Sequence, residues 1–154
     1  MTLAAIGARV GHETVTTSAQ RPSGSFNRMG WARSSIDELG NETFRKVRRE
    51  LGITAFGANV LVLQPGVTGR PHYHEEQDEL YFVHRGRAIF DLPNDRIELG
   101  PGGMLHVEST TARRVTNPGP EELVMLVVGA KEGYVGRDGR PATPKAFLRD
   151  LDAD

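Results

Sequence analysis

Residues 71–86 read PHYHEEQDELYFVHRG and hold three of the chain's five histidines and four of its acids. His72 and His74 are two residues apart, so on a β-strand their side chains point to the same face. Residues 75–78 can form a turn that places the Glu79 carboxylate at the start of the next strand. Two imidazoles and one carboxylate suit a divalent first-row transition metal. The stretch therefore predicts a metal site at His72, His74 and Glu79.

Short apolar segments alternate with turn residues on both sides of this stretch. The chain has eighteen glycines and nine prolines, which supply many tight turns. Short strands at this spacing indicate an all-β sandwich or small barrel rather than β-α-β units. The predicted strands are residues 54–64, 79–83, 87–92, 97–99, 104–107, 113–116 and 122–128.

The chain divides into three predicted parts. They are an N-terminal arm with a short helix that packs on the barrel (residues 1–52), the barrel itself (53–130) and a polar C-terminal tail (131–154). The short helix is expected near residues 41–51, because Phe44, Val47 and Leu51 recur at the spacing of one helix face. Gly52 follows them, and glycine is common where a helix ends.

Length and composition exclude several classes of protein. A chain of 154 residues with 38% hydrophobic and 25% charged residues fits one globular domain. Nineteen basic and twenty acidic residues leave a net charge of −1, so nothing favours a nucleic acid or an anionic membrane as partner. The absence of cysteine excludes disulfides and thiol chemistry. Because no signal peptide and no apolar run of membrane-spanning length is present, we expect a cytoplasmic protein.

The spacing around the histidines matches a known signature. Gly66, His72, His74, Glu79 and Gly86 are separated by five, one, four and six residues. This pattern resembles the first signature motif of the cupin superfamily, and the resemblance covers roughly residues 54–129. It implies a small single-domain cupin with a conserved barrel, that is, a jelly-roll or double-stranded β-helix fold. It also implies one divalent metal per chain (Mn, Fe, Co, Ni, Cu or Zn) at the residues named above.

Metal-binding cupins carry a second motif that supplies one more histidine. One alignment uses Pro101 and Gly102 followed by His106, but no glycine precedes them at the right distance. The better alignment keeps the spacing and both end residues of the motif. It runs through Gly102, Glu108, Thr110, Arg113 and Asn117. The resemblance therefore places Arg113 where the fourth metal ligand usually stands.

An arginine at this position changes the expected chemistry. A guanidinium has no lone pair and keeps its charge, so Arg113 cannot bind a metal and would repel one nearby. In one arrangement Arg113 clamps a substrate carboxylate beside the metal. In a second it pairs with Glu79 and leaves a metal-free pocket, and in a third His106 or Glu108 completes the metal site. A fourth arrangement has Arg113 pointing outward as a solvated charge.

Strand alternation places further residues relative to the pocket. Tyr81 shares a face with Glu79 and is therefore a candidate catalytic residue. Arg113, at the position of the fourth ligand, is the other candidate catalytic residue. His84 falls on the opposite face and is expected to point outward. Asn59, a polar residue within an apolar strand, and His106 are candidate substrate contacts.

Two functional hypotheses follow from the resemblance. In the first, the protein is a metal-dependent enzyme of dioxygenase, isomerase or decarboxylase type, acting on a small oxygenated or anionic substrate. In the second, it binds or senses a small molecule without catalysis, in a pocket that Arg113 leaves metal-free. The fold does not separate these two. The family's habit and the exposed strand edges also favour a homodimer.

Overall fold

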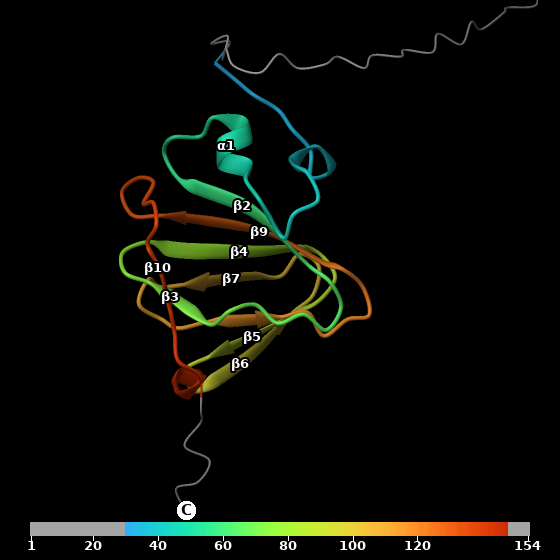
Figure 1. Cartoon of the computed structure of the whole chain (residues 1–154), viewed down its shortest axis with the longest axis vertical. Coiled ribbons are helices and arrows are strands. Elements are labelled where there is room, and N and C mark those ends of the chain that lie inside the picture. The colour runs from blue at the N-terminus through green and yellow to red at the C-terminus, as the bar shows by residue number, and fades with distance from the viewer. Residues whose placement is uncertain (1–29, 148–154) are drawn as a thin grey trace, which may run out of the picture. The chain divides into compact units, whose positions relative to one another are not determined.

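The computed structural model describes residues 30–147, which form three antiparallel sheets and short helical segments (Figure 1). The strands are β1 (Phe44–Arg45), β2 (Gly57–Leu63), β3 (His72–His74), β4 (Asp78–Arg85), β5 (Ala88–Leu92), β6 (Asp95–Leu99), β7 (Met104–Val107), β8 (Arg114–Thr116), β9 (Leu123–Ala130) and β10 (Gly139–Pro141). The helical segments are η1 (Asp37–Leu39), α1 (Val47–Leu51) and η2 (Pro144–Phe147). Between residues 30 and 147, no helix is long and apolar enough to cross a membrane. The predicted all-β class is confirmed.

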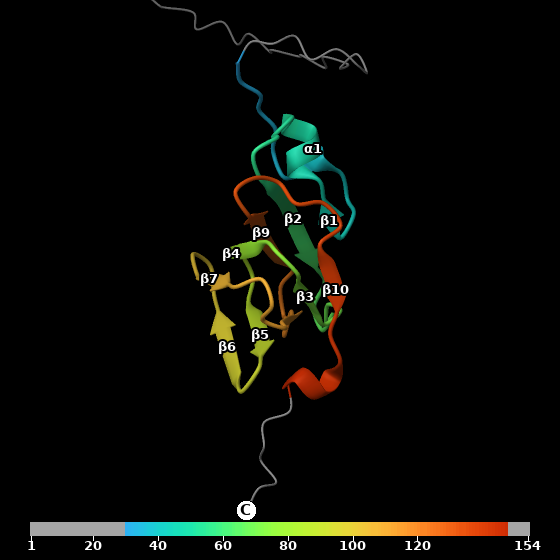
Figure 2. The ribbon, with the colours of Figure 1, turned by 90° about the vertical axis from the view of Figure 1, so that its left-hand side faces the viewer.

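The sheets bring together strands that are distant in the sequence. The largest sheet has the order β1-β2-β9-β4-β7, and a second sheet has the order β6-β5-β8. The third sheet pairs β3, which carries the two histidines, with β10 from the C-terminal part of the chain. Figure 2 shows β3 and β10 side by side.

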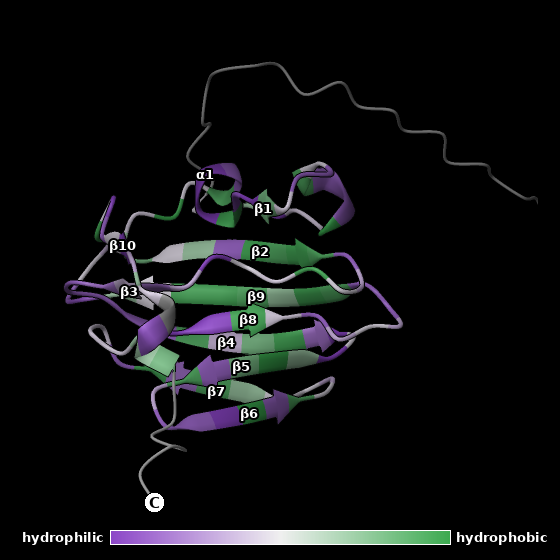
Figure 3. Cartoon of the chain, turned by 60° about the horizontal axis from the view of Figure 1, so that its bottom comes forward, coloured by the Kyte–Doolittle hydropathy of each residue, from purple (hydrophilic) through white to green (hydrophobic). Residues whose placement is uncertain are grey.

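The core lies between the two larger sheets, and both contribute to it. Its most buried large side chains are Val83, Phe90, Leu123 and Met125. Figure 3 shows that apolar residues dominate β2 and β9, whereas polar residues dominate β6. Apolar burial of this kind is the main favourable contribution to folding.

Alternation along β4 decides which side chains enter the core. Glu79, Tyr81 and Val83 are buried, whereas Leu80 and His84 are exposed. The predicted outward position of His84 is confirmed, and Tyr81 lies on the same inner face as Glu79.

The short helix begins later than the sequence pattern predicts. α1 starts at Val47, because Phe44 and Arg45 pair with β2 as the edge strand β1 instead of continuing the helix. Val47 still packs against the outer face of β2 and β9, together with Ile36 and Leu39. Gly52 ends the helix in the left-handed conformation, with φ of 68°, as predicted.

The segment predicted as a polar tail forms part of the β-structure. β10 pairs with β3, so that Gly139 lies opposite His74 and Pro141 opposite His72. This pairing covers one edge of the strand that carries the histidines. Residues 1–29, within the predicted N-terminal arm, lie outside the described residues.

Asn117, the last residue of the second motif, ties two loops together from inside the fold. Its fully buried amide donates to the carbonyl oxygens of Leu63 and Glu121, each at 2.8 Å. Its oxygen accepts from the N–H of Gly119, also at 2.8 Å. One side chain therefore satisfies three backbone groups where the chain leaves β8 for β9.

Replacing Asn117 by alanine should lower the free energy of unfolding by about 3 kcal/mol, because three backbone groups lose their partner. Chemical denaturation followed by circular dichroism measures this change. Thr110→Ala, at an exposed position, is the control and should change stability by less than about 0.5 kcal/mol. Equally small effects of the two substitutions would contradict the role assigned to Asn117.

Candidate functional site

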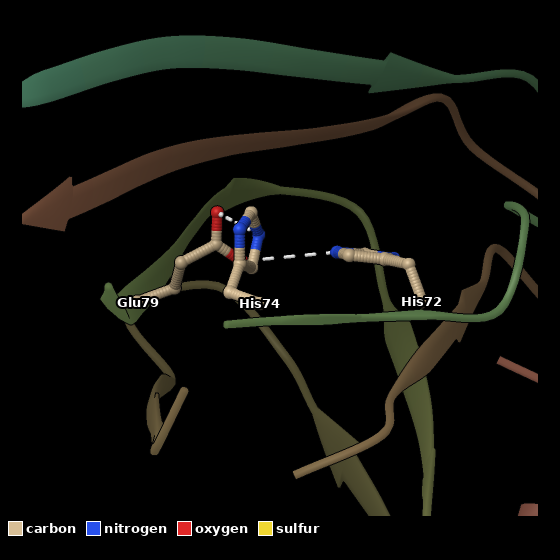
Figure 4. A group of neighbouring side chains, drawn as sticks. All are labelled: His72, His74 and Glu79. Atoms are coloured by element: carbon tan, nitrogen blue, oxygen red, sulfur yellow. Dashed lines mark ion pairs between the residues drawn. The ribbon is translucent and has the colours of Figure 1, made fainter. Parts of the chain in front are cut away.

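The chain brings His72, His74 and Glu79 together at one point inside the barrel. The two imidazoles come from β3, and the carboxylate comes from β4 after the turn at residues 75–78. Their possible ligand atoms all lie within 4.8 Å of one another. Nε2 of His74 is 3.1 Å from Oε1 of Glu79, and Nε2 of His72 is 3.9 Å from Oε2. Figure 4 shows the ring of His72 directed toward the other two side chains.

Arg113 points into this site and not into solvent. Its backbone exchanges two hydrogen bonds with His72, at 2.8 and 3.0 Å, and its residue is only 1% exposed. Arg113 thus lies beside the predicted ligands, where the alignment that begins at Gly102 would place the fourth ligand. Nη2 of Arg113 donates to Oε2 of Glu79 at 2.9 Å.

The guanidinium of Arg113 is almost fully engaged by the protein. Besides Glu79, it donates to the hydroxyl of Tyr81 at 3.2 Å and to the carbonyl oxygens of Ser109 and Thr111 at 3.1 and 2.7 Å. These contacts occupy four of its five N–H groups. The expected role as a substrate clamp does not fit this geometry, because Arg113 holds Glu79 instead.

Tyr81 also forms a hydrogen bond with Glu79. Its buried hydroxyl donates to Oε2 of the carboxylate and accepts from Nε of Arg113. Burial raises the pKa of the Tyr81 phenol, and the nearby Glu79 charge raises it further. The phenol therefore keeps its proton and holds one oxygen of Glu79, which is a positioning role.

The carboxyl group of Glu79 is ionised. Burial alone would raise its pKa, but hydrogen bonds from His72, His74 and Tyr81 outweigh burial and hold the pKa well below its ordinary value. The residue is 9% exposed, so this charge is largely shielded from water. A buried carboxylate of this kind requires compensating partners.

The outer nitrogen of each imidazole is fixed by an acceptor. Nδ1 of His72 lies 3.2 Å from the carbonyl oxygen of Arg70, which can only accept. Nδ1 of His74 lies 3.5 Å from Oδ2 of Asp138 and 3.1 Å from the amide end of Gln77, whose own oxygen has no partner in its present orientation. A half-turn of that amide would present its oxygen to Nδ1. When a cation binds, a proton on each Nδ1 leaves the two Nε2 lone pairs free for it, whereas without a cation a proton on Nε2 donates to Glu79.

The chemistry of these donors fits a divalent cation. The Nε2 atoms of the two imidazoles and a carboxylate oxygen converge on one point. Arg113 and Tyr81 bind only Oε2 of Glu79, so they leave Oε1 available to a cation. Adjacent ligands held at right angles about 2.1 Å from a metal lie about 3 Å apart. The 3.1 Å between Nε2 of His74 and Oε1 of Glu79 matches that spacing.

Asp138, which the sequence patterns did not indicate, supports the site from the C-terminal part of the chain. Its buried carboxylate accepts from the N–H groups of Glu76 at 3.1 Å and Gln77 at 2.9 Å, and it faces Nδ1 of His74. Burial alone would raise the pKa of Asp138, but the hydrogen bonds from Gln77 and Glu76 lower it below its ordinary value. Asp138 thus fixes the turn that joins His74 to Glu79.

A cavity of about 580 Å³ opens above the candidate metal ligands. Its lining includes His72, His74, Glu79, Tyr81 and Arg113 together with Asn59. Asn59 is half-buried, and its predicted position at the pocket agrees with the structure.

His106 and Glu108 are not brought into this group. Both are exposed, and the imidazole of His106 lies 3.5 Å from Asp78. His106 pairs with the outward-facing Leu80 in the sheet, so its side chain belongs to the outer surface. The expectation that His106 contacts a substrate, or that either residue completes the metal site, is not supported by this geometry.

Comparison with known proteins agrees with this architecture. The family profile described as the cupin domain matches residues 59–129. Among solved structures, the chain is similar to a sugar phosphate isomerase of the cupin superfamily from Silicibacter pomeroyi, at 25% sequence identity with a TM-score of 0.54. That similarity covers 57% of this chain and 58% of the isomerase, so this chain spans less than two thirds of its length. No curated protein matches the chain.

Two further solved structures share the fold at lower identity. A conserved protein with a double-stranded β-helix domain from Klebsiella pneumoniae is 19% identical, with a TM-score of 0.59, covering 72% of this chain and 96% of that chain. A cupin protein from Bacteroides fragilis is 16% identical, with a TM-score of 0.59, covering 78% and 96%. The predicted double-stranded β-helix is confirmed.

Replacing Asp138 by asparagine should accelerate hydrogen exchange at the amides of Glu76 and Gln77 by about tenfold, because a neutral acceptor binds them more weakly. Nuclear magnetic resonance resolves exchange at each amide. Asp78→Asn is the control, since Asp78 is exposed and accepts from Ser109 instead. If the two variants left these amides equally protected, Asp138 would not hold the turn.

Proposed function

The chain carries a cupin domain at residues 59–129, and we propose that it binds one divalent transition metal and acts as an enzyme on a small anionic or oxygenated molecule. The observation that carries this proposal is the convergence of His72, His74 and Glu79 on one point. Mn, Fe, Co, Ni, Cu and Zn all accept two imidazoles and a carboxylate. When bound, such an ion polarises a substrate oxygen as a Lewis acid.

The protein's own residues hold the site ready for the ion. Tyr81 and Arg113 bind Oε2 of Glu79, which keeps the carboxylate ionised and turned toward His74. Asp138 and the Arg70 carbonyl orient the two imidazoles. A site whose ligands are fixed before binding loses less conformational freedom when the ion or the substrate arrives.

The charges of the site favour an anionic substrate. Glu79 and Arg113 neutralise each other, and Asp138 adds one negative charge behind His74, so a divalent ion would leave one positive charge uncompensated in a partly buried pocket. A carboxylate or enolate oxygen would compensate part of this charge. The side chain of Asn59 lines the same cavity and can hydrogen-bond a substrate oxygen. A dioxygenase, an isomerase and a decarboxylase each act on substrates of this kind.

A second candidate function rests on the contact between Arg113 and Glu79. At 2.9 Å, this ion pair already satisfies the buried carboxylate, and it supports a metal-free cupin that binds or senses a small molecule. Metal-loaded protein can be screened against small hydroxy and keto acids, with oxygen uptake and mass spectrometry as readouts. Turnover supports the enzyme, whereas saturable binding without turnover supports the second function.

Protein purified without a metal-affinity tag and reconstituted with Mn, Fe, Co, Ni, Cu or Zn should hold about one equivalent of metal per chain. Glu79→Gln should lose it, because the amide is a far weaker ligand than the carboxylate. Elemental analysis after desalting measures the content. Glu98→Gln, at an exposed carboxylate of β6, is the control and should retain the metal. Wild-type protein that takes up none of these metals would rule out the metalloenzyme.

Replacing Arg113 by histidine should raise metal affinity by at least about tenfold, because the change removes a positive charge and supplies a lone pair. Competition with a chelator of known affinity measures the dissociation constant. Arg113→Gln separates the two effects, since it removes the charge without adding an imidazole ligand. Unchanged affinity in both folded variants would contradict the position assigned to Arg113.

A further inference from the structure

The cavity above the candidate metal ligands has two chemically different ends. Its floor is formed by the buried polar group around Glu79 and Arg113. Its mouth is formed by five exposed residues: Thr43, Phe44, Lys46, Val67 and Arg70. Phe44 is 50% exposed and Val67 is 42% exposed, although both are apolar and line the same cavity.

The two cations at the mouth are Lys46 and Arg70. Lys46 precedes α1, and its ammonium lies 5.6 Å from the ring centroid of Phe44. Arg70 precedes β3, and its carbonyl oxygen binds Nδ1 of His72. Within residues 30–147, neither side chain forms an ion pair, whereas Arg114 and Arg140 each bind a carboxylate.

The cavity offers no free carboxylate to balance these cations. Glu79 is the one acidic residue among the lining side chains that the structure describes, and it is already paired with Arg113. Lys46 and Arg70 therefore give the mouth a positive potential directed at whatever enters. An anion at the mouth would compensate charge that the protein leaves exposed.

Between the two ends the wall is mostly apolar. Leu61, Leu63, Val115 and Val127 are buried side chains of β2, β8 and β9 that line the cavity. They offer no hydrogen bonds, so a molecule rich in hydroxyl groups would lose its bonds to water there without replacement. An apolar molecular body would gain from burial at the same place.

We propose that the ligand of this cavity is a small organic acid with an apolar body, whose anionic group is bound by Lys46 and Arg70 at the mouth. The body lies against the apolar wall, and an oxygen at its other end faces His72, His74 and Glu79. The placement of that oxygen rests on the proposed function, whereas selection by the mouth and wall does not. A sugar phosphate would satisfy the two cations but not the wall.

Two fluorescent probes that differ by one anionic group test the mouth. 8-Anilino-1-naphthalenesulfonate has an apolar body and a sulfonate, and N-phenyl-1-naphthylamine is its neutral counterpart. Fluorescence titration should show that the double variant Lys46→Gln/Arg70→Gln binds the sulfonate about fivefold to tenfold more weakly than wild type. Binding of the neutral probe should stay unchanged, which also shows that the cavity is intact.

A matched pair of cations away from the mouth controls for net charge. Lys131 and Lys145 are exposed and do not line the cavity, so Lys131→Gln/Lys145→Gln should bind both probes as wild type does. Equal loss in both double variants, or none in either, would overturn the assignment of the mouth. Added salt should weaken sulfonate binding more in wild type than in the mouth variant.

Competition separates an organic acid from a sugar phosphate. 4-Phenylbutyrate should displace the sulfonate probe at a lower concentration than fructose 6-phosphate, and the reverse order would overturn the assigned substrate class. Both titrations are run on metal-free and metal-loaded protein. If the mouth selects the anionic probe but the protein binds no metal, the proposed enzyme is contradicted and this inference is not. If the protein takes up metal but the mouth does not select the anionic probe, only this inference is contradicted.

Discussion

The carboxylate of Glu79 is the group on which the rest of the site depends. It is buried and ionised, and such a charge is tolerated in a protein interior only when it is paired. Arg113 and Tyr81 bind one of its oxygens, and His74 faces the other. Tyr81 lies in β4, Arg113 directly precedes β8, and His74 lies in β3. These three strands belong to three different sheets, so the contacts of Glu79 link the sheets across the barrel.

This arrangement explains how a chain that matches the cupin profile over residues 59–129 can carry an arginine where the motif resemblance places a metal ligand. Arg113 stabilises the ionised form of the remaining carboxylate, but it also adds a positive charge beside any metal. Metal and substrate should therefore depend on each other, since an anionic ligand relieves the repulsion between Arg113 and the ion. The cations and apolar residues at the mouth favour the same class of ligand.

The parts of the site that follow from local spacing could be predicted from the sequence. The two-residue period of a strand placed His72 with His74 and Tyr81 with Glu79, and motif spacing placed Arg113 at the position of the fourth ligand. That Arg113 pairs with His72 is visible only in the structure. Asp138, β10 and the edge strand at Phe44 could not be found in this way. Their positions depend on pairing between segments distant in the sequence, which no local pattern records. The surface position of His106 became evident only from its register with Leu80.

Anomalous X-ray diffraction from crystals soaked in Mn²⁺ or Co²⁺ tests most directly whether the three acceptors form a metal site. We predict a single anomalous peak between Nε2 of His72, Nε2 of His74 and an oxygen of Glu79, with Arg113 still bound to the other oxygen. Contacts should be about 2.0–2.3 Å, the range of first-row metal–ligand bonds. A map with no peak at this point, and the pair of Glu79 and Arg113 unchanged, would contradict the metal site.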